Sequence, residues 1–218
     1  MGAIARSAAN LITTSGVVLK GAVNNDSFDN VTALPSSFGD GITLISSQTA
    51  SNSASISFTS GLTSTYKAYK FVFVNIHPAT DNVNFTFNLS TDSGSNYNVT
   101  KTTTFFWTYH DEADTATDFG YRTDKDLAQS TSYQNLNDNS GNGADESNSG
   151  TLTLFNPSST TYVKHFIATN NFYAHNDYTV NSYVAGYGNT TSAINAIRFQ
   201  MSSGNIDAGT IYLYGIKW

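Results

Sequence analysis

The sequence of 218 residues contains no cysteine and little charge, and each absence excludes classes of protein. Without cysteine there is no disulfide framework, no thiolate zinc site and no cysteine nucleophile. Only 12% of the residues are charged, and a net charge of -6 with an isoelectric point near 4.9 disfavours binding to the phosphate backbone of nucleic acids. Nucleic acid is therefore not among the expected partners.

Long apolar runs are also absent. No stretch approaches the eighteen or so apolar residues of a membrane-spanning helix. Near the N-terminus the longest apolar run is Val17, Val18 and Leu19, which is too short for a secretory signal peptide. We expect no membrane partner and no signal-dependent export, so a role outside the cell would require lysis or packaging in a particle.

Motifs that would identify an enzyme are missing as well. Residues 111–114 spell the Asp-Glu-Ala-Asp of helicases, but no phosphate-binding loop of the form G-x-x-x-x-G-K-[ST] accompanies them. No G-x-S-x-G elbow presents a serine nucleophile. The only glutamates, Glu112 and Glu146, fall in a long predicted loop, whereas a glycosidase fixes its paired carboxylates on rigid strands. We expect no catalytic site and no cofactor.

The dominant signal in the sequence is hydrophobic alternation with a period of two. In residues 82–91 the apolar side chains fall on one face and Asn and Thr on the other, which predicts a half-buried strand. Residues 71–74 are apolar at every position, which predicts a central strand covered on both faces. The other predicted strands lie at 42–47, 53–59, 99–109, 150–155, 161–168 and 178–187, and within 193–203 and 209–218.

About nine short strands separated by Gly, Asn, Asp and Ser clusters, without a convincing helix, indicate an all-β protein. Pro35, Pro78 and Pro157 fall at strand ends or in turns, where no ladder hydrogen bond is lost. We predict an antiparallel β-sandwich of jelly-roll type at residues 39–218, preceded by an extended N-terminal arm at residues 1–38.

The predicted arm is rich in small and polar residues. Such a segment buries too little apolar surface to offset its conformational entropy alone, so we expect neighbouring subunits to hold it. Its few apolar side chains should then act as an assembly anchor. These residues are Leu11, Ile12, Val17, Val18, Leu19 and Phe28.

Residues 110–149 interrupt the strand pattern and hold most of the acidic charge, so we predict a long loop that projects from one end of the sandwich. Aromatic rings in and beside this loop suit sugar recognition, because ring faces stack on sugars while Asn and Asp bond to their hydroxyls. The alternative is that many of these rings belong to the core. The candidate glycan-binding residues are Trp107, Tyr109, Tyr121, Tyr133 and Tyr173.

One part of this loop partly matches a calcium-binding loop. Asp138, Ser140 and Asn142 occupy the first, third and fifth positions of an EF-hand-like pattern, but Ser149 stands where the bidentate glutamate belongs. We therefore expect a solvated acidic loop without bound metal, and His110 beside its neighbouring acids also lacks metal-binding spacing.

Three long runs carry a resemblance to a known family. They are SFTSGLTSTYKAYKFVFVNIHPATDNVNFTFNLSTDSGSNY, GTLTLFNPSSTTYVKHFIA and AINAIRFQMSSGNIDAGTIYLYGIKW. With their Tyr-rich strand, P-A-T-D turn, Ser-Gly-rich turn and closing G-T-I-Y-L-Y-G-I strand, they resemble the repeated β-module of virion structural proteins of tailed bacteriophages, especially those of marine bacteria. The resemblance covers most of residues 42–218, and its motifs are structural, so it implies no active site.

This resemblance implies a particle component on the external surface of the virion, made in the host cytoplasm. It would be a tail-fibre or capsid-decoration subunit, anchored to other virion proteins by its arm. It also implies a homo-oligomer, with a trimer favoured because phage fibres and knobs are often trimeric. The alternative, which is compatible with the first in one molecule, is a carbohydrate-binding module that recognises host surface glycans through the long loop.

Overall fold

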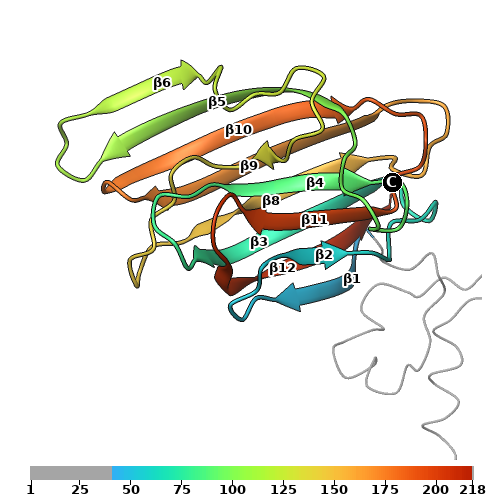
Figure 1. Ribbon diagram of the computed structural model, residues 1–218, viewed down its shortest axis with the longest axis horizontal. Coiled ribbons are helices and arrows are strands. Elements are labelled where there is room, and N and C mark those ends of the chain that lie inside the picture. The colour runs from blue at the N-terminus through green and yellow to red at the C-terminus, as the bar shows by residue number, and fades with distance from the viewer. Residues whose placement is uncertain (1–40, 218) are drawn as a thin grey trace, which may run out of the picture. The chain divides into compact units, whose positions relative to one another are not determined.

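The computed structural model describes residues 41–217, which form strands, bridges and turns (Figure 1). The predicted arm, with its six anchor residues, lies outside this range. The prediction of an all-β antiparallel sandwich is confirmed, whereas its assignment to the jelly-roll type stays a prediction. No helix among the described residues is long and apolar enough to cross a membrane.

Two antiparallel sheets make up the described chain. The larger sheet has eight strands in the order β1-β12-β3-β8-β9-β10-β5-β6, and the smaller has four in the order β2-β11-β4-β7. The strands of the large sheet are β1 (Ile42–Thr49), β12 (Ile206–Ile216), β3 (Ala68–Pro78), β8 (Asn148–Phe155), β9 (Lys164–Ala174), β10 (Tyr178–Gly188), β5 (Lys101–Asp111) and β6 (Thr117–Tyr121). Those of the small sheet are β2 (Ile56–Phe58), β11 (Ala196–Met201), β4 (Phe85–Ser90) and β7 (Gln134–Asn135).

Phenylalanine rings join the two sheets. Phe199 of β11 lies at the centre, with ring centroids 5.3 Å from Phe71 and 5.2 Å from Phe73 of β3. Phe87 of β4 meets Phe166 of β9 edge-on at 5.0 Å. All five rings are at most 1% exposed, so the alternating apolar positions of both sheets face each other and form one core.

The strand at 82–91 is more buried than its alternation predicts. Every residue of β4 is buried, including Thr86 and Asn88 on its polar side. The Asn88 amide donates to the backbone oxygens of Tyr97, at 2.7 Å, and Thr131, at 2.9 Å. The half-buried prediction is wrong because these two segments cover the polar face and satisfy its donors.

The opposite error occurs at residues 71–74. Phe71 and Phe73 face the core and are at most 1% exposed, but Val74 is 39% exposed and Val72 is only half-buried. The small sheet covers one face of β3, and no other described segment covers the second. The prediction that this strand is covered on both faces is therefore wrong within residues 41–217. The large sheet keeps an open face with exposed apolar side chains.

Residues 110–149 do not form one projecting loop. They include β6, which pairs with β5 at the sheet edge, and β7, which pairs with β4. Leu136 is fully buried, and its backbone oxygen accepts from the Asn170 amide at 3.0 Å and the Ser182 hydroxyl at 2.6 Å. These hydrogen bonds place the segment against the inner faces of β9 and β10. In Figure 1 the strands β10, β5 and β6 extend beyond the small sheet, so the segment covers a region that the small sheet leaves open.

Candidate binding surface

Two of the five predicted glycan-binding residues lie together. Trp107 and Tyr109 of β5 share the inner face of the large sheet, 5.5 Å apart between ring centroids, and Tyr109 stacks on Tyr178 of β10 at 5.1 Å. The Arg122 guanidinium lies 4.0 Å over the Trp107 ring. The rings pack on each other, on this cation and on a small buried cluster around Phe172. Their faces are thus used within the fold.

The other three predicted residues lie elsewhere. The Tyr121 hydroxyl donates to Asp126 at 2.6 Å, and this hydrogen bond raises the Tyr121 pKa. The Tyr173 hydroxyl donates to Glu112 at 2.8 Å, which raises the Tyr173 pKa in the same way. Burial raises the pKa of Tyr133, and the nearby positive charge of Arg198 lowers it in part. Arg198 belongs to β11 of the small sheet, so Tyr133 lies away from Trp107 and Tyr109 of the large sheet. The structure therefore does not bring the five aromatic residues into one site.

The partial calcium motif is occupied by the chain itself. The Asp138 side chain is fully buried and pairs with Arg122 at 2.5 Å and Lys125 at 2.8 Å. The Ser140 hydroxyl donates to the Asn148 side chain at 2.9 Å. Two cations at one carboxylate oppose a bound divalent cation there. Within residues 41–217, no cluster of three or more His, Cys, Asp or Glu side chains could hold a metal ion.

The two glutamates bond to local partners. Glu112 accepts from the Tyr173 hydroxyl, and Glu146 accepts from the backbone of Gly143 at 2.5 Å in its own turn. His110 pairs with Asp114 at 3.0 Å, and both side chains are well exposed. These contacts stabilise turns and strand ends.

The open face of the large sheet, which we name the outer face, extends over eight strands of the described chain. Its side chains stand in cross-strand rows set by the register of the ladders. The first row is Leu44, Tyr214, Lys70, Thr153, Ile167, Ala185 and Thr104. The second row is Ser47, Tyr212, Val72, Thr151, Thr169, Tyr183, Phe106 and Tyr121.

The outer face is nearly uncharged. Lys70 is the one charged residue of the two rows, and it makes no ion pair within the described range. Apolar side chains remain exposed, with Ile167 at 54% and Leu44 at 53%. Most carboxylates of the chain lie instead in turns and loops, so the acidic surface and the outer face are largely separate.

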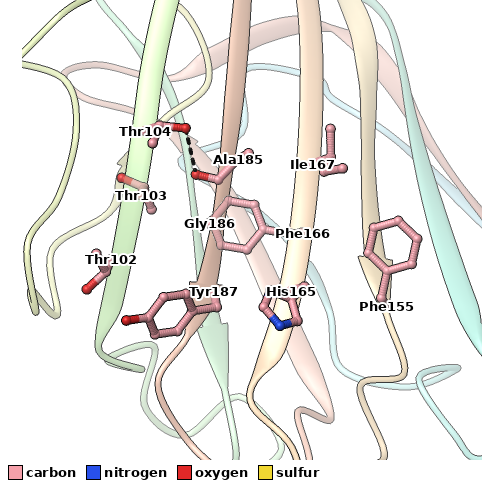
Figure 2. A pocket seen from close by; sticks show the side chains of 10 residues that line it. All are labelled: Thr102, Thr103, Thr104, Phe155, His165, Phe166, Ile167, Ala185, Gly186 and Tyr187. Atoms are coloured by element: carbon pink, nitrogen blue, oxygen red, sulfur yellow. Dashed lines mark hydrogen bonds between the residues drawn. The ribbon is translucent and has the colours of Figure 1, made fainter.

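A hollow of about 490 Å³ opens on the outer face where β9, β10 and β5 run side by side (Figure 2). Ala185 and Gly186 line it, and the single methyl group of Ala185 leaves space on the outer face that a larger side chain would fill. A Cβ at Gly186 would lie 2.5 Å from the backbone oxygen of Thr102, so glycine permits the close approach of β10 and β5. His165 and Tyr187 border the hollow, with ring centroids 6.0 Å apart.

Sequence reasoning missed the outer face, although a signal was present. Residues 178–187 carry Val180 and Val184 on one face and Tyr183, Ala185 and Tyr187 on the other. A strand that is apolar on both faces needs cover on both. The cross-strand rows also depend on which strands are neighbours in the sheet. Alternation within one strand does not specify its neighbours, so the rows could not be predicted from the sequence.

Comparison with known proteins identified no relative. No protein-family model matches the chain, and neither the curated proteins nor the solved structures contain a significant match.

Proposed function

We propose that this chain is a structural subunit of a bacteriophage particle, displayed as a fibre, appendage or capsid-decoration protein, and that its outer face contacts neighbouring subunits. The observation that carries the subunit contact is the outer face itself, which is nearly uncharged, exposes apolar side chains and is uncovered by the described chain. The bacteriophage setting rests on the resemblance of residues 42–218 to the β-module of virion proteins.

The size of this face supports a macromolecular contact. Eight strands spaced about 4.8 Å apart give a width of about 34 Å. Exposed apolar side chains recur across this width, at Leu44, Val74 and Ile167, and such an exposed apolar surface is typical of an interaction site. Threonine and tyrosine between the aliphatic residues let such a face meet water before assembly, because their hydroxyls still bond to solvent.

The internal contacts of the polar groups fit a structural role as well. The carboxylates, histidines and aromatic residues that the sequence singles out bond to other groups of the same chain, as Tyr121, Glu146, Glu112, His110 and Asp138 do. Backbone ladders hold the outer face rigid over all eight strands. A rigid face loses little conformational entropy on contact, which favours repeated subunit packing.

The test is incorporation into particles. Virions from a host that expresses the full chain should contain it, as detected by mass spectrometry and immunogold labelling. Ile167→Glu places a charge at an exposed position of the outer face and should reduce incorporation at least tenfold. Thr59→Glu makes a comparable change at an exposed position after β2 and should incorporate normally. Absence of the chain from virions, or equal incorporation of both variants, would refute the proposal.

Carbohydrate binding is a second candidate function, which the hollow on the outer face favours over the loop aromatics. The hollow combines a small apolar floor with the Tyr187 ring, the His165 imidazole and the Thr102 hydroxyl. Such a mixture suits a sugar, which presents apolar C–H faces and hydroxyl groups. Binding of the full chain to a glycan array should be lost in Tyr187→Ala and kept in Tyr212→Ala, and an array without any bound glycan would exclude this second function alone.

A further inference from the structure

We infer that the outer face packs against the outer face of a second copy of this chain, about a two-fold axis that runs parallel to the strands between β8 and β9. The inference rests on the proposed function only in taking the outer face as a subunit contact. It adds the partner, the symmetry and the residues that meet.

Charge favours a second copy at this face. Each chain carries a net charge of -6, so contact between acidic surfaces would add to the repulsion of two copies, whereas contact between neutral surfaces would not. The two central rows contain Lys70 and no carboxylate. The outer face is thus a place where two acidic chains can meet without opposing their negative charges.

The strand order selects the axis, because β8 and β9 are the two central strands of the large sheet. Exposed large apolar side chains lie toward both edges of the outer face, at Leu44 on β1 and at Phe119 and Tyr121 on β6, and the hollow at Ala185 lies on β10 beside β5. A two-fold axis between β8 and β9 places β3 opposite β10 and β12 opposite β5, given the strand order. Every strand of the outer face then lies opposite a strand of the second copy, and the hollow of each copy faces β3 of the other.

The same axis predicts individual contacts. Because it runs along the strands, each cross-strand row meets its own equivalent in the second copy. Thr153 then lies opposite Ile167 of the second copy, and Val72 lies opposite its Tyr183. Lys70 lies opposite the small Ala185 of the second copy. Tyr183 and Tyr187 flank Ala185 on the same face of β10, and their rings can stabilise the ammonium group without a carboxylate.

The available area is sufficient. A width of about 34 Å and strands of eleven residues, at about 3.4 Å per residue, give an upper limit of about 1,300 Å² for the face. A stable interface buries about 800 Å² per partner. Twisted sheets that stack face to face lie about 10 Å apart with their strands inclined by about 30°.

Sedimentation of the full 218-residue chain tests the oligomeric state. Wild type should be a dimer at micromolar concentration, and Ile167→Glu and Thr153→Glu should each raise the dimer dissociation constant at least 100-fold. Thr59→Glu should remain dimeric, and circular dichroism should show that all four proteins are folded. A monomeric or trimeric wild type, or a dimer unaffected by Ile167→Glu, would overturn the inference.

Cross-linking tests the position of the axis. Because the natural chain has no cysteine, Thr153→Cys introduces a single thiol beside the predicted axis. A bismaleimide that spans about 10 Å, the distance between stacked sheets, should link two copies within minutes. Ser203→Cys, at an exposed turn after β11, should link far more slowly. Equal rates for the two variants would place the contact elsewhere.

The two proposals fail in different ways. A dimer that depends on Ile167 but is absent from virions would refute the particle function and leave this contact intact. A monomer whose incorporation into virions depends on Ile167 would refute the self-contact, because another virion protein would then cover the outer face.

Discussion

The two faces of the large sheet carry similar side chains in different surroundings. On the inner face, Phe71, Phe105 and Phe166 are at most 1% exposed, whereas Val74 and Ile167 on the outer face are 39% and 54% exposed. Adjacent residues of one strand thus differ more in burial than in hydrophobicity. Side-chain polarity shows that a face requires cover, and only the arrangement of the chain shows whether the molecule provides it.

The largest expected effect compares neighbours on β9. Phe166→Ala removes a ring from the core and should lower the free energy of unfolding by about 3 to 5 kcal/mol, since the cavity cannot close fully. Ile167→Ala should lower it by less than about 1 kcal/mol, because that side chain is already half in water. Urea unfolding of dilute protein measures both values, and equal losses would mean that the outer face is covered within one chain.

The second comparison concerns the segment that covers the inner face. Asp138→Asn removes the buried charge that faces Arg122 and Lys125 and should cost about 3 kcal/mol, because both cations lose a desolvated partner. Asp124→Asn changes an exposed carboxylate beside the same arginine, whose hydrogen bond holds the Asp124 pKa at about 2. Its cost should stay below about 1 kcal/mol. Similar melting curves for both variants would show that residues 122–140 do not stabilise the inner face.

The third comparison is between two lysines and concerns pH. Burial lowers the pKa of Lys101 from 10.5 to about 7, while its ammonium donates to Asn88 at 2.5 Å and to the backbone oxygen of Val99 at 2.8 Å. Between pH 7 and 10.5 the unfolded chain binds more protons at this site than the folded chain, so stability rises with pH, by at most about 1.4 kcal/mol per pH unit.

Lys101→Met should remove this part of the pH dependence, and Lys70→Met on the outer face should leave it unchanged. Urea titrations at several pH values give the slope. A wild-type slope that survives in Lys101→Met would assign the effect to other groups.

The smallest effects concern hydroxyls on the two faces. Thr103 donates to the Gln134 side chain at 2.6 Å within the core, so Thr103→Val should cost about 1 to 2 kcal/mol by leaving a buried acceptor unpaired. On the outer face the Tyr183 hydroxyl accepts from Asn181 at 2.8 Å, and water can replace it in Tyr183→Phe. That loss should stay below about 0.5 kcal/mol, and differential scanning calorimetry at low concentration should rank the two.

The sequence predicted most strands because alternation is local. The runs around Phe85, Phe199 and Leu213 form β4, β11 and β12 with the predicted residues inward. It did not predict β6 and β7, because β6 lies in the acidic stretch assigned to the loop, with weak alternation, and β7 has only two residues. The two residues of β7, Gln134 and Asn135, pair with β4 more than forty positions earlier, and neither is apolar.

The candidate surface was harder to predict than the fold. Trp107 and Tyr109 were expected near one another, since alternation on one strand places them two residues apart on one face. Tyr133 and Tyr173 were grouped with them as residues in or beside the predicted loop. Tyr133 instead lies near Arg198 of the other sheet, and Tyr173 follows the buried Phe172 on β9, so it lies on the outer face. The outer face required the pairing of eight strands, which depends on long-range contacts that no single segment encodes.

The edges of the large sheet determine how copies of this protein can accumulate. An exposed edge strand is a template for further strands and can lead to fibres. Here the ladder of β1 shifts register between Leu44 and Ser46, and β6, at the opposite edge, has only five residues. Both features hinder the addition of strands in the plane of the sheet. At high concentration, as in a crowded lysate, we therefore expect copies that meet to do so through their outer faces, as discrete assemblies, and not to grow into amyloid-like fibrils.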